Sequence, residues 1–225
     1  MKTKLMMTAL VAGTMLWAGA AQAQTFDTNF TISVNQVIPD NDPNGLASVT
    51  NLTLQGFAVT GVTVGLNISG GYNGDLYAYL AGPGGFAVLL NRVGVSNTAS
   101  ALGYGDAGFN VTFSSAGANN IQYYQGYTNP AGGVVFGTWQ PEGVNINPQS
   151  APSAFLGATR TATLASFNGT TPNGQWELFL ADVSPGSQST LVSWNLDIAT
   201  VPEPSIMVLT GLGLAGFVRM IRRRK

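Results

Sequence analysis

Apolar and polar residues alternate with a period of two through much of the segment from Gln24 to Thr200. Successive side chains of a strand point to opposite faces, so this alternation predicts half-buried β-strands. The clearest alternating runs are residues 62–68, 76–80, 109–113, 176–180 and 194–198. No helix of ordinary length is predicted between them. The segment is therefore expected to fold almost entirely from strands.

Clusters of Gly, Pro, Asn and Asp separate the alternating runs, at residues 42–45, 73–74, 82–85, 172–174 and 185–186. Gly and Asn tolerate positive φ and Pro presets a turn, so each cluster predicts a turn. The cluster at 82–85 predicts a hairpin between residues 76–80 and 86–90. Many short strands without helices favour an all-β fold, an antiparallel sandwich or barrel.

Residues 114–152 interrupt this pattern because they are rich in small and amide side chains and have little periodicity. We interpret them as a long loop or insertion with a short edge strand at residues 132–139. Trp176 and Trp194 fall on the apolar side of their runs and are predicted to lie in the core.

The composition excludes several classes of function. The 225 residues contain no His and no Cys, which excludes disulfides, histidine- or thiolate-ligated metals and the Ser-His-Asp triad. The segment between Gln24 and Thr200 contains nine acidic residues and only two basic ones, Arg92 and Arg160. Its net charge is therefore −7. Two cations cannot make the phosphate contacts of a nucleic-acid-binding protein, and without lysine there is no Ser-Lys dyad.

The N-terminus has the pattern of a secretory signal. Lys2 and Lys4 precede an apolar stretch at residues 5–20, and Ala21-Gln22-Ala23 forms a small-residue cleavage site. Residues 1–23 are therefore predicted to be a signal peptide, with the mature chain beginning at Gln24. The alternative is a transmembrane helix that is retained.

The C-terminal residues 201–225 have three parts: Pro202-Glu203-Pro204, an almost wholly apolar run at residues 205–218, and Arg222-Arg223-Arg224. This arrangement resembles the PEP-CTERM sorting signal of Gram-negative bacteria. The resemblance implies a short hydrophobic sorting helix that anchors the chain transiently in the inner membrane, and processing by an exosortase. It also implies a location at the cell surface or in an exopolysaccharide matrix. The alternative is a plain C-terminal membrane anchor.

Three pieces of the middle segment follow a familiar order: Gly74-Asp75-Leu76, then Gly-Gln-Trp-Glu-Leu at residues 174–178, then Asp182 and Trp194. Over about residues 30–199 the chain resembles the proprotein-convertase P-domain. The resemblance implies a jelly-roll-like β-sandwich over residues 24–200. Because P-domains commonly accompany subtilisin-like proteases, it also implies an alternative function, an accessory domain that binds or regulates a separate protease.

The segment Asp40-x-Asp42-x-Asn44-Gly45 places oxygen ligands at alternate positions before a glycine, as the first half of a calcium loop does. The twelfth position is Asn51 instead of a bidentate Glu, so the segment is not an EF-hand. Asp75 and Asp182, each next to a predicted strand end, are further candidates, and some P-domains bind calcium. We predict Ca²⁺ at these residues. The alternative is that the carboxylates cap backbone amides in turns.

Four aromatic residues lie among amides in the irregular segment: Tyr123, Tyr124, Tyr127 and Trp139. Exposed rings stack on the C–H faces of sugars while neighbouring amides bind hydroxyls, so these residues are candidates for carbohydrate binding. The alternative is that the rings pack the loop onto the sandwich.

Together these observations predict a non-catalytic exported protein that binds exopolysaccharide or has a structural role in a biofilm. A polysaccharide hydrolase is a weaker alternative, because paired carboxylates are the catalytic groups left to this composition. Glu142 and Glu177 are the candidates for such a pair.

Overall fold

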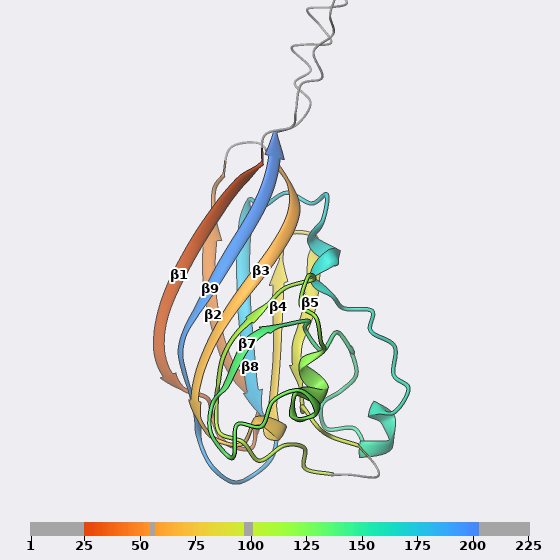
Figure 1. Ribbon diagram of the computed structural model, residues 1–225. Helices are drawn as coiled ribbons and strands as arrows, with labels where there is room; N and C mark the ends of the chain where they lie inside the picture. Colours follow the sequence, from red (N-terminus) through yellow and green to blue (C-terminus); the bar gives the residue numbers. More distant parts are fainter. Residues whose placement is uncertain (1–24, 55–56, 97–100, 203–225) are drawn as a thin grey trace, which may run out of the picture.

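The computed structural model describes residues 25–54, 57–96 and 101–202 (Figure 1). The predicted signal peptide and the predicted sorting helix lie outside these ranges. Within them, no helix is long and apolar enough to cross a membrane.

The chain forms nine strands within the described ranges: β1 (Phe26–Val37), β2 (Asp42–Leu52), β3 (Phe57–Gly70), β4 (Leu76–Gly82), β5 (Gly85–Asn91), β6 (Phe109–Phe113), β7 (Val135–Trp139), β8 (Gly174–Asp182) and β9 (Ser189–Pro202). Four short 3₁₀ helices join them: η1 (Asn73–Asp75), η2 (Ile121–Gly126), η3 (Pro152–Phe155) and η4 (Leu164–Phe167).

The strands form two sheets that pack as a β-sandwich, which confirms the predicted all-β fold class. The five-stranded sheet has the order β1-β9-β3-β6-β7, and the four-stranded sheet has the order β2-β8-β4-β5. Nearly all neighbouring strands are antiparallel, as predicted, but β6 and β7 are parallel. Parallel neighbours need a long crossover connection, and residues 114–134 supply it.

Side chains that alternate along the strands meet between the two sheets. Trp176 and Trp194 are fully buried, which confirms their predicted place in the core. The indole N–H of Trp194, on β9, donates a hydrogen bond of 2.9 Å to the hydroxyl of Ser48, on β2 of the opposite sheet. Trp176 donates to the backbone carbonyl of Pro172 at 2.8 Å. Both indole donors are therefore satisfied without exposing the rings.

The hairpin predicted at residues 82–85 is present, with Gly82 opposite Gly85 at the end of β4 and β5. The edge strand predicted within residues 132–139 is β7, at the edge of its sheet.

The structure corrects the prediction at residues 42–45. These residues begin β2, where the register against β8 shifts between Asp42 and Leu46. Gly45 has a φ of +53°, and a Cβ there would lie 2.1 Å from the carbonyl oxygen of Leu180. The turn-forming residues thus form a bulge within a strand, where the bulged backbone approaches β8 too closely for a side chain.

The two ends of the sandwich differ. Phe26 at the start of β1 is opposite Thr200 near the end of β9, so both described chain ends lie at one end of the sandwich (Figure 1). At the other end, the connection after β1, helix η1 and the end of β8 lie together (Figure 1).

Candidate functional site

Three of the predicted calcium ligands, Asp40, Asp75 and Asp182, interact electrostatically at the end of the sandwich opposite the described chain ends. Asp182 ends β8 and is opposite both Asp42 on β2 and Leu76 on β4. Asp75 comes directly before Leu76, and its backbone carbonyl accepts a hydrogen bond of 2.9 Å from the amide of Val183. The carboxylate of Asp40 accepts from the amide of Gly186 at 3.1 Å. The segment from Val183 to Gly186 therefore hydrogen-bonds to both Asp75 and Asp40.

The electrostatics of this acidic group favour protonation. The pKa of Asp182 is raised to about 6, chiefly by burial and also by the negative charges of Asp75 and Asp40, against the hydrogen bond from the Ser184 amide. Burial also raises the pKa of Asp75, while a hydrogen bond with Ser184 and the charge of Arg92 oppose that rise. Asp182 is fully buried, and its Oδ2 atom has no hydrogen-bond partner.

Asp42, although opposite Asp182, hydrogen-bonds to Asn44. Oδ1 of Asp42 accepts from both the backbone amide and the side-chain amide of Asn44, each at 2.9 Å. This is the turn-capping arrangement that the sequence left as an alternative. Within the described residues, no three Asp, Glu, His or Cys side chains form a group that could hold a metal ion. Calcium binding at Asp40, Asp75 and Asp182 stays a prediction.

The four candidate sugar-binding rings divide into two exposed and two buried residues. Tyr123 and Tyr127 are 58% and 62% exposed, whereas Tyr124 is fully buried and Trp139 is 6% exposed. Tyr124 packs edge-on against Tyr104, with ring centroids 4.7 Å apart. Tyr124 and Trp139 therefore pack the irregular segment onto the sandwich, because a ring without solvent-exposed surface cannot stack on a sugar.

A buried carboxylate anchors the segment that carries the exposed rings. Oδ2 of Asp106 accepts from the hydroxyl of Tyr124 at 2.7 Å and from Nε2 of Gln125 at 2.6 Å, and Oδ1 accepts from the amide of Gly132 at 2.8 Å. Three donors satisfy this carboxylate, so its burial is compensated. These hydrogen bonds connect helix η2 and the residues just before β7 to Asp106. Tyr123 and Tyr127 therefore lie on an anchored segment.

The sequence reasoning missed the exposed ring of Phe136 on β7, which is 63% exposed. Its neighbour Val135 is buried. The alternation of Val135 and Phe136 within the expected edge strand was the signal that could have identified it, because one of two successive strand residues must face outward.

A second aromatic cluster covers the outer face of the four-stranded sheet. Tyr79 stacks on Phe179 with centroids 4.8 Å apart and an interplanar angle of 14°. Tyr77 and Phe86 pack against this pair. Stacked neighbours cover each other's ring faces, so this cluster stabilises the sheet and offers little ring face to a sugar.

The two glutamates that a hydrolase would need have separate contacts. Glu177 accepts a hydrogen bond of 3.1 Å from the hydroxyl of Tyr79. Glu142 is buried, and its Oε2 accepts from the amide of Val144 at 2.7 Å. Burial raises the pKa of Glu142 to about 7, against the hydrogen bond from Val144 and the charge of Arg160.

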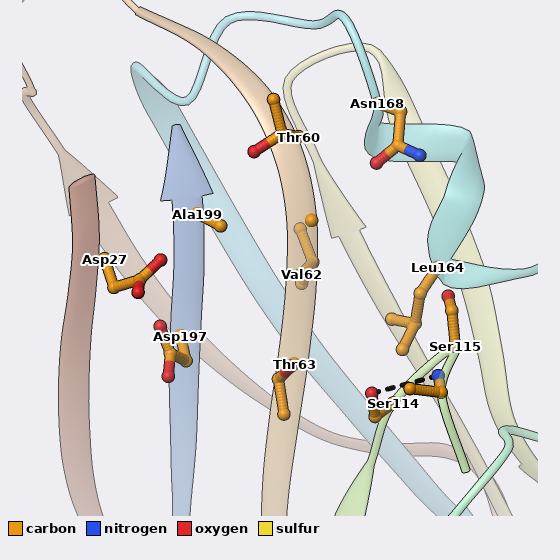
Figure 2. A pocket seen from close by; sticks show the side chains of 12 residues that line it. Asp27, Thr60, Val62, Thr63, Ser114, Ser115, Leu164, Asn168, Asp197 and Ala199 are labelled. Carbon is orange, nitrogen blue, oxygen red and sulfur yellow. Dashed lines mark hydrogen bonds between the residues drawn. The ribbon is translucent and has the colours of Figure 1, made fainter. Parts of the chain in front are cut away.

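A depression of about 390 Å³ with a mixed polar and apolar lining lies beside β3 of the five-stranded sheet, and Val62 and Leu164 are among its lining residues (Figure 2). Asp27 on β1 and Asp197 on β9 line it, with their carboxylates pointing toward each other, and Thr63 lies on β3. Ser114, Ser115 and Asn168 border it on the far side of β3. Among the described residues, no basic side chain lines this depression.

A protein-family model for the PEP-CTERM protein-sorting motif matches residues 200–225. The chain carries this sorting motif. Such a motif marks an exported protein sorted to the cell envelope of Gram-negative bacteria. Of the predicted motif residues, Pro202 ends β9, while Glu203, Pro204 and Arg222–Arg224 lie outside the described residues.

The body of the chain is similar to solved structures of a bacterial protease. A chain in the crystal structure of the Aeromonas sobria serine protease with its chaperone is 16% identical, with a TM-score of 0.44 over 80% of this chain. The Aeromonas sobria serine protease alone gives 16% identity and a TM-score of 0.42 over 79% of this chain. The matches span 28% and 27% of those longer chains. No curated protein matches the chain.

Proposed function

We propose that this is a non-catalytic protein of the cell surface or extracellular matrix that binds exopolysaccharide. In this proposal an exosortase recognises the C-terminal motif, and the apolar run anchors the chain transiently in the inner membrane until it is processed. The sorting motif supports export to the envelope.

The exposure of Tyr123 and Tyr127 on an anchored segment carries the binding proposal. Both rings are more than half exposed, and the neighbouring Tyr124 is held by the buried Asp106. A tyrosine presents a large flat surface and loses little conformational entropy on binding, because it has only two side-chain torsions. Stacking on the C–H face of a sugar uses that surface, and the phenol can also hydrogen-bond to hydroxyls.

The residue inventory supports a binding function without catalysis. The chain has no His or Cys, and the two glutamates available for acid–base chemistry contact Tyr79 and Val144. The two arginines of the body donate to backbone carbonyls: Arg92 to Ala101, and Arg160 to Glu142 and Pro141. Amides, phenols and the other carboxylates can recognise sugar hydroxyls without His, Cys, these two glutamates or these two arginines.

The experiment compares the exported protein with a variant carrying Tyr123→Ala and Tyr127→Ala. Tyr72→Ala is the matched control, because Tyr72 is an exposed tyrosine elsewhere on the molecule, at 46% exposure. We expect the double variant to bind the exopolysaccharide of the producing bacterium at least tenfold more weakly, with an unchanged melting temperature. Unchanged affinity in the double variant would refute the assignment of these rings.

A further inference from the structure

The outer face of the five-stranded sheet is polar and almost uncharged. Residues directly opposite one another on neighbouring strands point to the same face, so the register defines rows of side chains. One row is Thr31, Asn195, Gly65, Thr112 and Thr138, and the next is Ser33, Ser193, Asn67, Asn110 and Phe136. None of these residues is buried.

Two depressions follow β3 along this face. The first, at Gly61 and Thr63, is the one in Figure 2. The second, of about 200 Å³, lies at Gly65 and Asn67 and is bordered by Asn110, Thr112, Ser193 and Asn195. Their central glycines are four residues apart, which is about 13 Å along a strand. An extended ligand lying along β3 could occupy both depressions.

Gly61 follows a shift in the register of β3 against β9, between Val59 and Gly61, and packing does not require a glycine there. A Cβ there would meet only the Cβ of Ala199, at 3.8 Å, which is an ordinary van der Waals contact. Gly65 differs, because a Cβ there would approach the Cβ of Asn195 to 3.1 Å. Glycine inside a strand marks either a bulge or a place where a ligand or another backbone approaches closely. The absence of a side chain at Gly61 keeps the floor of the first depression open.

The two ends of the line of depressions along β3 offer different contacts to a ligand. At one end, Asp27 and Asp197 provide carboxylates, which are strong acceptors for hydroxyl donors. At the other, Phe136 shares a row with Asn110 and exposes 63% of its surface. A flat ring beside amides and hydroxyls suits a ligand with both C–H faces and hydroxyl groups. That combination is characteristic of sugars.

The charge of the face selects among polysaccharides. Asp27 and Asp197 border the first depression, and no basic residue in the described part of the chain lines it. An anionic polymer would be repelled by these carboxylates, whereas neutral sugar hydroxyls would donate to them.

From these observations we infer that the outer face of the five-stranded sheet binds a linear neutral polysaccharide. The chain of sugars lies along β3 from the depression at Gly61, past Gly65, toward Phe136. This inference rests on the proposed function as a polysaccharide-binding protein, and it adds a second contact surface and a preference for uncharged sugars.

The test measures dissociation constants of the exported protein for cellohexaose, mannohexaose and hexagalacturonate by calorimetry. Gly61→Val fills the floor of the first depression, and Phe136→Ala removes the exposed ring. Ala47→Val is the matched control for Gly61→Val, because Ala47 is an exposed strand residue on the other sheet. We expect at least one neutral hexasaccharide to bind at least tenfold more tightly than hexagalacturonate. Gly61→Val and Phe136→Ala should each weaken that binding at least fivefold, and Ala47→Val should not. Melting curves check that each variant is folded.

The outcomes separate this inference from the proposed function. One outcome is that the native exopolysaccharide binds through Tyr123 and Tyr127, while Gly61→Val and Phe136→Ala change neither its affinity nor that of a neutral hexasaccharide. In that case the sheet face is not a binding site, and the proposed function stands. Tighter binding of hexagalacturonate than of the neutral probes would also overturn the inference. If the native polymer and all probes fail to bind, both proposals are wrong.

Discussion

The hydroxyl of Tyr124 donates a 2.7 Å hydrogen bond to Oδ2 of Asp106, 18 residues earlier in the chain, and both residues are buried. The same hydroxyl accepts from Nδ2 of Asn73 at 3.2 Å. One phenol thus connects η2, the segment before β6 and helix η1. Tyr124 determines where the exposed rings on either side of it are held.

We therefore predict that Tyr124→Phe destabilises the protein. A hydrogen bond to a charged group contributes about 1.5–3 kcal/mol, and the variant removes one donor from a buried carboxylate. Urea unfolding should show a loss of that size. The adjacent Tyr123→Phe is the control, because Tyr123 is exposed, and it should leave the free energy of unfolding unchanged. Equal stabilities of the two variants would contradict the anchoring role of Tyr124.

The buried Glu142 predicts a pH dependence of stability. Its pKa rises from an ordinary value near 4.5 to about 7 in the fold, chiefly through burial. Between these pH values the folded protein keeps a proton that the unfolded chain has released, so the free energy of unfolding falls as pH rises. Across that pH range the loss of stability is on the order of a few kcal/mol. Two groups interact electrostatically with Glu142. The charge of Arg160 lowers the pKa of Glu142, and Glu142 raises the pKa of Tyr77.

Glu142→Gln tests this prediction because it keeps the shape of the side chain and cannot ionise. Unfolding measured between pH 4.5 and pH 8 should show a shallower decline in the variant than in the unmodified protein. Asp27→Asn, at an exposed carboxylate, is the control and should retain the full decline. Parallel profiles for Glu142→Gln and the unmodified protein would mean that Glu142 is ionised in the fold at low cost.

Calcium is predicted to raise the melting temperature through Asp40, Asp75 and Asp182. A cation that binds only the folded state stabilises it by about 2.7 kcal/mol at a hundredfold excess over Kd. Asp75→Asn combined with Asp182→Asn should abolish the difference between calcium and chelator. Asp42→Asn should preserve it, because Asp42 already accepts two hydrogen bonds from Asn44. Superimposable melting curves of the unmodified protein in calcium and in chelator would show that these carboxylates bind no calcium.

The sorting motif predicts processing at both ends of the chain. Mass spectrometry of the exported protein should give an N-terminus at Gln24 and a C-terminus near Pro204. Replacing Arg222, Arg223 and Arg224 with alanine should leave the C-terminal segment attached, because the basic cluster is part of the sorting motif. Released native protein that still contains Lys225 would contradict the predicted C-terminal processing.

Local alternation was sufficient to predict much of the fold. The run at residues 109–113 is β6 with the same bounds, and the hairpin at residues 82–85 is present. The edge strands β1 and β2 were missed. Asp42, Pro43, Asn44 and Gly45 have strong turn preferences, but pairing with β8 places them in a bulge at the start of β2. Hydrogen bonding to a neighbouring strand outweighed local preference there.

The candidate site, like the fold, was predictable from the sequence only in part. The residues themselves determined which chemistry the protein can use: no His or Cys, few cations, and aromatic rings among amides. Tertiary structure decided which rings face solvent. Tyr123 is exposed and Tyr124 is buried although they are adjacent, because Asp106 and Asn73 bind only the second. A segment without regular periodicity has no predictable inner face, so burial there depends on partners distant in sequence. The polar face along β3 has the same origin, since it exists only where β9, β3, β6 and β7 pair in one register.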